Sequence, residues 1–271
     1  MKAALPLVLL AVIPVGLFMP ALYPWLNPDT ARDLHNLFYL NVPFLTGRTV
    51  AYVVVWLGLA VGILLDLGVR RWAPAGLILL ALTSTFAAID ATLALDPHMN
   101  SSIYGMLVGT GMTLFALSLA LLLALPGATG RGRDDLGKLL LALCVLWAYL
   151  DFVQFLVIWS SNLATDTPWM ERRFTGFWFW ALWAMAGLHT VAPLFLLAIP
   201  RFRLNDAGVM ALAAALVLSS IVRGWWLVLP EAGRIPGLID AACMIGVGAT
   251  AIGAALLLGR VPALRRRVAY G

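Results

Sequence analysis

The sequence predicts an all-α integral membrane protein, a polytopic bundle of about eight transmembrane helices. The 271-residue chain is 62% hydrophobic and only 11% charged, whereas soluble domains have roughly 45–50% apolar and about 25% charged residues. Apolar runs of about 20 residues, long enough to cross a bilayer core of about 30 Å, recur along its length. The connections leave no room for a soluble domain, so we expect residues 1–271 to form a single membrane domain.

Eight apolar runs are predicted to span the membrane. They cover residues 4–25, 49–68, 74–96, 103–125, 139–160, 177–199, 207–227 and 237–259. The N-terminus is basic and then apolar, like a signal peptide, but it has no clear small-residue cleavage site, so we expect a first spanning helix there. The connections are short except at 26–48. There, an Asp29 cap signal and mixed polarity predict an interfacial periplasmic segment with a re-entry turn at Pro43.

The distribution of basic residues predicts the orientation. Twelve of the 18 Lys and Arg residues fall on the side that holds both termini, and cytoplasmic loops carry an excess of such residues. Both termini are therefore expected in the cytoplasm. The net charge of +5 is then a topology signal, and no nucleic-acid partner is expected.

Two carboxylates lie inside predicted helices, where a charge costs about 2.5 to over 10 kcal/mol unless it is paired, hydrated or neutral. Asp90 lies about six residues, or roughly 9 Å, below the outer end of its helix. Asp151 lies near the middle of its helix, with Gln154 on the same face. No basic residue lies within one turn of either carboxylate. We expect both to face the bundle interior, where a carboxyl group can pass protons or bind a ligand.

The other interior polar groups have structural as well as functional interpretations. His189 either bonds two helices together or extends a proton path inward from Asp90, and Asp96 and His98 would form the outer mouth of such a path. Arg223 and Asp240 are adjacent in topology and similar in depth, which favours a structural ion pair.

The cysteine and histidine content argues against a resident metal. Cys144 and Cys243 lie in apolar runs, and without a CxxC motif we expect no zinc site, iron–sulfur cluster or covalent haem. Of the three histidines, only His189 lies at depth, since His35 and His98 are interfacial, so an internal bis-histidine haem is not expected. We expect no catalytic residue in this chain alone. The tryptophans near predicted interfaces are expected to be membrane anchors: Trp25, Trp169, Trp178, Trp225 and Trp226.

Three segments resemble one protein family in their order and spacing over residues 38–180. They are FYLNVPF with Arg48 downstream, IDATLALDPHMNSSIYG, and WAYLDFVQFLVIWSSNL followed by TPW. They are similar to the F-type membrane subunit of alternative complex III, a bacterial quinol:electron-acceptor oxidoreductase, within the polysulfide-reductase-like group of membrane anchors. Matching positions include Asn41, Pro43, Arg48, Asp90, Asp96, His98, Tyr104, Gln154, Trp159 and Asn162. The chain differs from the family at Ala91 and Met99, where aromatic residues are usual, and at Asp151.

The resemblance implies a non-haem membrane subunit of a bacterial respiratory electron-transfer complex. It implies quinol oxidation near the periplasmic face, proton conduction, or both. The proton path or quinone pocket would include Asp90, Asp96, His98, Asp151, Gln154 and His189. Quinone is the cofactor that this chain could bind. Haem and iron–sulfur centres are expected in partners such as cytochrome, iron–sulfur or haem–copper oxidase subunits.

Two other functions fit the same composition. In an accessory scaffold of a respiratory supercomplex, the interior polar residues would only lock helices and bind partner subunits. A solute transporter would have discontinuous helices and two matched halves; the sequence shows no such internal symmetry, so this reading ranks lowest.

Overall fold

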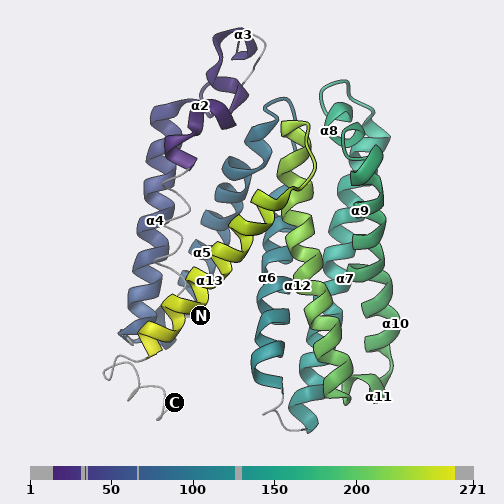
Figure 1. Ribbon diagram of the computed structural model, residues 1–271. Coiled ribbons are helices and arrows are strands. Elements are labelled where there is room, and N and C mark those ends of the chain that lie inside the picture. Colours follow the sequence, from purple (N-terminus) through teal and green to yellow (C-terminus); the bar gives the residue numbers. More distant parts are fainter. Residues whose placement is uncertain (1–14, 32–33, 35, 66, 126–129, 260–271) are drawn as a thin grey trace. The chain divides into compact units, whose positions relative to one another are not determined.

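The computed structural model describes residues 15–31, 34, 36–65, 67–125 and 130–259, in which every regular element is a helix (Figure 1). The all-α prediction is therefore confirmed for these residues. Six of the described helical segments are long and apolar enough to cross a membrane, as expected of a multi-pass membrane protein. They are Val42–Ile63, Val69–Leu95, Tyr104–Leu123, Arg131–Ser161, Gly176–Ala198 and Asp206–Ala232.

These six segments correspond to six of the eight predicted spans. The predicted span at 4–25 lies mainly outside the described residues, and its described end has a turn at Phe18 followed by α2 (Met19–Leu22). The span predicted at 237–259 corresponds to α13 (Leu238–Gly259), a helix of 22 residues. The cytoplasmic location of both termini stays a prediction.

The chain divides into two compact units. Unit 1 comprises Met1–Pro97 and Pro236–Gly271, and unit 2 comprises His98–Ile235. The remaining described helices of unit 1 are η1 (Pro24–Leu26), α3 (Pro28–Ala31), α4 (Val42–Leu64), α5 (Val69–Ala91) and η2 (Leu93–Leu95). The long helices α4 and α5 pack together as a hairpin, so the start of α4 and the end of α5 lie at the same end of unit 1 (Figure 1).

The first turns of α4 replace part of the predicted interfacial segment. That segment was predicted to run to residue 48, but α4 begins at Val42. The side chain of Asn41 caps the helix by accepting a hydrogen bond from the Phe44 N–H at 2.9 Å, as N-cap residues do. Pro43 occupies one of the first two helical positions, where proline needs no N–H partner. Pro43 therefore starts a helix, and the polar residues after it, including Arg48, belong to α4.

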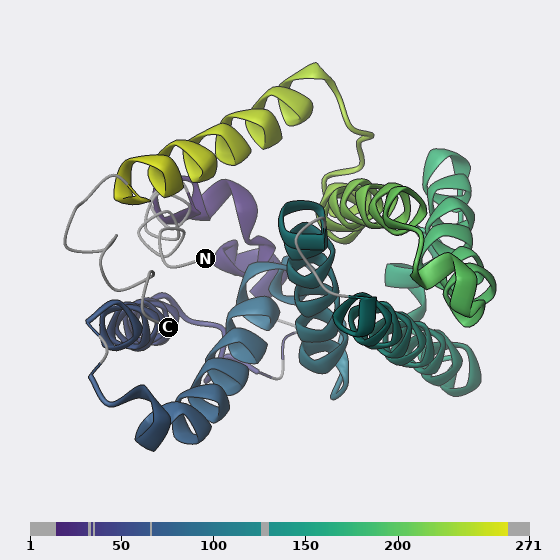
Figure 2. The same ribbon diagram turned by 90° about the horizontal axis from the view of Figure 1, so that it is seen from below.

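Unit 2 is built around α12. Its helices are α6 (Tyr104–Ala124), α7 (Gly130–Ser161), α8 (Thr167–Glu171), α9 (Gly176–Ala186), η4 (Gly187–Val191), α10 (Ala192–Ala198), α11 (Pro200–Arg203), α12 (Asp206–Val228) and η5 (Leu229–Ala232). Within the unit, α12 packs on α6 and α6 packs on α7 (Figure 2). On α6, Leu107, Leu114 and Leu121 repeat every seven residues and are at most 2% exposed, which is the spacing that keeps one helical stripe against a neighbour.

The span Gly176–Ala198 is not a uniform α-helix. Its middle part, η4, is a π-helical segment in which the N–H of Ala192 bonds to the carbonyl of Gly187. Pro193 follows at once, and it has no N–H to give to the carbonyl of His189. A π-type turn is one way to absorb such an interruption, and π-bulges occur often at functional sites.

Candidate functional site

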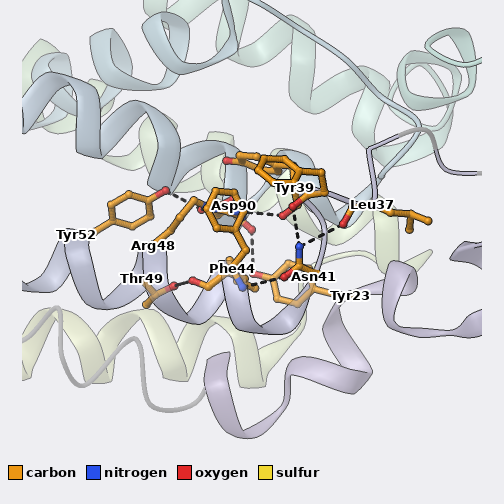
Figure 3. A network of polar contacts seen from close by, with 11 residues as sticks. Tyr23, Leu37, Tyr39, Asn41, Phe44, Arg48, Thr49, Tyr52 and Asp90 are labelled. Atoms are coloured by element: carbon orange, nitrogen blue, oxygen red, sulfur yellow. Dashed lines mark hydrogen bonds and ion pairs between the residues drawn. The ribbon is translucent and has the colours of Figure 1, made fainter.

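Asp90 forms a complete set of polar contacts at the end of α5 (Figure 3). Arg48 donates from Nε to Oδ2 at 3.1 Å and from Nη2 to Oδ1 at 2.9 Å. The Tyr52 hydroxyl donates to Oδ2 at 2.9 Å. The carboxylate is therefore held by three donors from α4, and Asp90 is only 5% exposed.

The Arg48 guanidinium is fixed as firmly as the carboxylate. Nη1 donates to the Tyr39 carbonyl at 3.0 Å. The guanidinium carbon lies 3.7 Å from the centre of the Tyr39 ring and 4.4 Å from that of Phe44, so cation–π attraction adds to the ion pair. Asn41, which caps the helix, places Phe44 for this contact. Asn41, Pro43 and Arg48 thus build the start of α4 and its ion pair.

Two tyrosines outside the six described spans border this network. The Tyr23 hydroxyl donates to the backbone carbonyl of Asp90 at 2.9 Å. Burial first, and then the negative charge of Asp90, raise the pKa of Tyr23 to about 12. The same two causes raise the pKa of Tyr39 above its ordinary value. Both phenols remain neutral at physiological pH.

Asp151 forms an ion pair with Arg223, which comes from α12. The sequence analysis found no basic residue within a turn of Asp151; its partner lies 72 positions along the chain. The described ion-pair partner of Arg223 is therefore Asp151. Arg223 and Asp240 belong to different units, so the ion pair predicted between them stays a prediction. Asp240 itself accepts a hydrogen bond from the Gly237 N–H at 2.8 Å, at the start of α13.

A pocket of about 420 Å³ lies beside the Asp151–Arg223 pair, between α7, α8, α9, η4 and α12. We call it the aromatic pocket because seven of its lining residues are aromatic: Trp147, Phe152, Phe155, Trp169, Phe174, Trp183 and Trp226. Its polar lining consists of Asp151, Gln154, Thr190 and Arg223. The Asp151 side chain keeps 24% of its surface exposed, and Gln154 accepts a hydrogen bond from Ser101 through Oε1.

The rim of the aromatic pocket is apolar and exposed. Phe152, Trp183 and Val191 line the pocket and are 59%, 60% and 52% exposed. All three lie within segments that are long and apolar enough to cross a membrane.

His189 lies behind the pocket wall in the π-helical segment. It is 2% exposed; Nδ1 is 2.9 Å from the Ser219 hydroxyl and Nε2 is 3.4 Å from that of Ser220. The Ser220 hydroxyl also donates to the Leu216 carbonyl at 2.7 Å, and the directions of the two imidazole contacts depend on the tautomer of His189. The pocket residue Trp147 packs on the imidazole, with ring centres 4.5 Å apart. His189 thus supports the pocket wall through Trp147.

The other residues predicted for the site do not line the aromatic pocket. Asp96 ends η2 and is 8% exposed. His98, in unit 2, is exposed, and its carbonyl accepts from Asn100. Tyr104 is buried at the start of α6, and Trp159 is 70% exposed on α7. Asn162 follows α7 with a φ of 46°, a left-handed conformation that asparagine tolerates at helix ends. The structure brings Asp151 and Gln154 to one pocket and places Asp90 in the other unit.

Arg173 is a buried residue that the sequence analysis counted only as a topology signal. Its guanidinium is 0% exposed and donates to the carbonyls of Trp169, Trp226 and Leu227 and to Glu231 at 2.8–3.2 Å. Burial lowers its pKa to about 10, so it stays charged at neutral pH. These bonds join α8 to the end of α12 and place two pocket tryptophans. No sequence signal distinguishes the buried Arg173 from its neighbour Arg172, whose side chain is partly exposed.

The tryptophans were also misjudged from the sequence. Trp169 and Trp226, expected as interfacial anchors, are 2% and 3% exposed and line the aromatic pocket. Trp25 and Trp178 are likewise buried. Trp169 and Trp226 contact each other, and the Arg173 guanidinium lies over both rings. Trp225 is only partly buried.

Comparison with known proteins adds no family assignment. No protein-family model matches the chain, and no curated protein matches it. Among the described residues, no group of three or more His, Cys, Asp or Glu side chains could hold a metal ion.

Proposed function

We propose that this chain is a non-haem membrane subunit of a bacterial respiratory electron-transfer complex, and that unit 2 binds a quinone or quinol in the aromatic pocket. The observation that carries the proposal is the pocket itself: aromatic walls, a few polar groups, and a rim of exposed apolar side chains on helices long enough to cross a membrane. The resemblance of three sequence segments to a quinol oxidoreductase subunit supports the same function.

The dimensions and chemistry of the pocket suit a quinone head group. Ligand pockets commonly have volumes of about 300–1,000 Å³ and apolar walls with a few polar groups, and the aromatic pocket, at about 420 Å³, is of that kind. Planar rings stack on Trp and Phe side chains. An isoprenoid tail would leave past Phe152 and Trp183 into hydrocarbon, so the ligand would never have to cross water.

The electrons would pass to redox centres in partner subunits. We expect haem or iron–sulfur partners, and a location in the bacterial inner membrane with the quinone side toward the periplasm. Any proton release from quinol belongs at the pocket, where Asp151 keeps part of its surface exposed. We propose no role in proton transfer for Asp90, because three donors already hold its two oxygens.

Photoaffinity labelling tests the proposal. An azido-quinone should label peptides of α7, α9 and α12 in the complex purified from native membranes, and excess unlabelled quinone should prevent this. Ala186→Phe fills the pocket and should abolish the label. Ala184→Phe is the matched control, because Ala184 is exposed on the same helix and does not line the pocket. Labelling that is absent, or that persists in Ala186→Phe, contradicts quinone binding.

An accessory scaffold is the second candidate, and the paired state of Asp90 favours it. A carboxylate that is held by Arg48 and Tyr52 locks α4 to α5 without any need for chemistry. The scaffold role predicts that haem or copper-containing partners co-purify while the azido-quinone labels nothing in unit 2. Isolation of the chain as a lone monomer from native membranes would contradict both candidates.

A further inference from the structure

The polar groups that line the aromatic pocket differ in whether a ligand can reach them. Nη1 of Arg223 and Nε1 of Trp226 are buried, so they are closed to a ligand. The Asp151 side chain, in contrast, keeps 24% of its surface exposed. Arg223 bonds to its Oδ1. Oδ2 has no hydrogen-bond partner among the described residues, and it is not one of their buried unpaired atoms. Oδ2 of Asp151 is therefore an acceptor that is open to the pocket.

Gln154 places a donor beside this acceptor. It follows Asp151 by three residues on α7, so the two side chains share one face of the helix, and both line the pocket. Oε1 of Gln154 accepts from the Ser101 hydroxyl, which leaves Nε2 as the free end of the carboxamide. Nε2 is likewise absent from the buried unpaired atoms of the described residues. The pocket thus offers a ligand both a charged acceptor and a neutral donor.

We propose that Asp151 accepts a hydrogen bond from a ring hydroxyl of the pocket ligand, with Gln154 as the neighbouring donor. On the proposed function, on which this inference rests, the pocket then binds the reduced quinol in preference to the quinone. A hydroxyl both donates and accepts, whereas a carbonyl only accepts and would set its lone pairs against those of the carboxylate. An ammonium group could also donate to Asp151. Because Arg223 already balances the charge of Asp151, a second cation would remain uncompensated between apolar walls.

Three ligands of one scaffold separate these chemistries. The first is a 2-methyl-1-naphthol with a short prenyl chain, which donates like a quinol and is not a quinone. The second has fluorine in place of the hydroxyl, so it keeps the shape and cannot donate. The third is the corresponding 1,4-naphthoquinone, which only accepts. All three should stack on the aromatic walls, and a hydrogen bond to a charged group corresponds to roughly tenfold or more in affinity.

The experiment measures competition of each ligand against azido-quinone labelling, with the purified complex in quinone-free nanodiscs. The nanodiscs consist of phosphatidylcholine, which has no hydroxyl group, and ligand amounts are expressed per mole of lipid. In the wild type, the naphthol should compete about tenfold better than the fluoro compound or more, and it should also compete better than the quinone.

Two changes at Asp151 test the residue itself. In Asp151→Asn, the amide oxygen can stay with Arg223 and an N–H₂ donor then faces the ligand, so the advantage of the naphthol should fall severalfold. Asp151→Leu with Arg223→Met removes both charges together, and such apolar replacement of a buried pair is often tolerated. It should bring the naphthol and the fluoro compound close to equal affinity.

The ion pair between Asp134 and Arg203 provides the matched control. Its side chains are 27% and 11% exposed, close to the 24% and 10% of Asp151 and Arg223. Neither residue lines the pocket. Asp134→Leu with Arg203→Met should therefore keep the wild-type order of the three ligands.

Each outcome bears on a separate claim. If the naphthol competes no better than the fluoro compound or the quinone in the wild type, or keeps its advantage in the Asp151 variants, the hydroxyl contact is overturned while quinone binding stands. Absence of labelling, and of competition by all three ligands, overturns the proposed function itself. The glycerol hydroxyls of phosphatidylglycerol share the proposed chemistry. Native mass spectrometry that finds this lipid on the wild type from native membranes, and not on the Asp151→Leu, Arg223→Met protein, would assign the contact to a lipid and overturn the quinol assignment. If Asp151→Asn does not fold, the double variant decides, and the comparison of ligands on the wild type needs no variant.

Discussion

Arg48 and Asp90 form a two-bond ion pair between α4 and α5. Asp90 lies in the last turn of α5, where the helix dipole is negative and disfavours a carboxylate, and the Arg48 guanidinium offsets this. Nε and Nη2 reach the two carboxylate oxygens at 3.1 and 2.9 Å. Because α4 and α5 form a hairpin, the pair ties the two helices together at their shared end (Figure 3).

Removing one partner of this pair should destabilise unit 1 strongly. The side chains are 11% and 7% exposed, and loss of one partner of a buried pair costs about 3–5 kcal/mol, since the other charge stays buried. We expect this loss for Arg48→Gln and Asp90→Asn, and about 1 kcal/mol for Tyr52→Phe, which removes one neutral donor. The measurement is reversible unfolding in mixed detergent micelles.

The double variant and an exposed arginine supply the controls. Arg48→Gln with Asp90→Asn leaves no unpaired charge, so its loss should be smaller than the sum of the two single losses. Arg71, exposed at the start of α5, should tolerate Gln with little change. Additive losses at Arg48 and Asp90 would mean that the two side chains act independently.

The Arg48–Asp90 pair could have been predicted from the sequence, but the start of the helix that carries Arg48 was placed too late. Adjacent helices of a hairpin bring residues of similar depth together, and the same reasoning suggested Arg223 with Asp240. Since α4 was predicted to start at residue 49, Arg48 counted as a loop residue, whereas Asn41 and Pro43 start the helix at Val42. A polar cap followed by proline signals a helix start even where hydropathy is low.

The aromatic pocket could not be predicted in the same way. Apolar runs located the six described spans, because hydrophobic length alone fixes them. They do not say which helices become neighbours, and Asp151 meets Arg223 across 72 positions. Tryptophans at helix ends look alike whether they anchor the membrane or line a cavity. Gln154 was chosen for its place beside Asp151 on α7, and that local reasoning did find a pocket residue.

Tyr23 should make unit 1 sensitive to alkaline pH. Its pKa is raised from 10.0 to about 12 in the folded protein, so below pH 10 both states hold the proton and its contribution is complete. Between pH 10 and about 12 the unfolded state loses the proton while the folded state keeps it, so stability falls as the pH rises. Tyr23→Phe removes this part of the slope. It should also cost about 0.5–1.5 kcal/mol at neutral pH, through the lost bond to the Asp90 carbonyl. Unfolding curves from pH 9 to 12 measure both effects, and equal slopes for the two proteins would contradict the assignment.

Gly62 makes room for Trp72 in the α4–α5 hairpin. A Cβ at Gly62 would lie 2.7 Å from Cζ2 of Trp72, whose indole N–H donates to the Leu67 carbonyl at 2.9 Å. Gly62→Ala should therefore displace the indole and cost about 1–3 kcal/mol, as overpacking does. Gly58→Ala on the same helix meets nothing within 4 Å and should be neutral or slightly stabilising, because alanine favours helix. Thermal unfolding with tryptophan fluorescence compares the two, and equal effects would show that the indole yields freely.

Arg173 and Arg172 are adjacent arginines, one buried and one exposed, whose variants test how the two pocket tryptophans Trp169 and Trp226 are held in place. Arg173 uses all three guanidinium nitrogens for four acceptors, and a lysine ammonium cannot reproduce that fork. Arg172 also pairs with Glu231, but its side chain is 37% exposed, so Arg172→Lys should cost under about 1 kcal/mol. Arg173→Lys should cost about 3 kcal/mol or more, as for other disrupted buried pairs.

The same two variants separate stability from ligand binding. Arg173 holds the carbonyls of Trp169 and Trp226, whose rings line the pocket. Arg173→Lys, assayed at a temperature where it remains folded, should therefore weaken azido-quinone labelling severalfold, while Arg172→Lys keeps wild-type labelling. Full labelling in folded Arg173→Lys would mean that the pocket keeps its shape without this residue, and Arg173 would then serve stability alone.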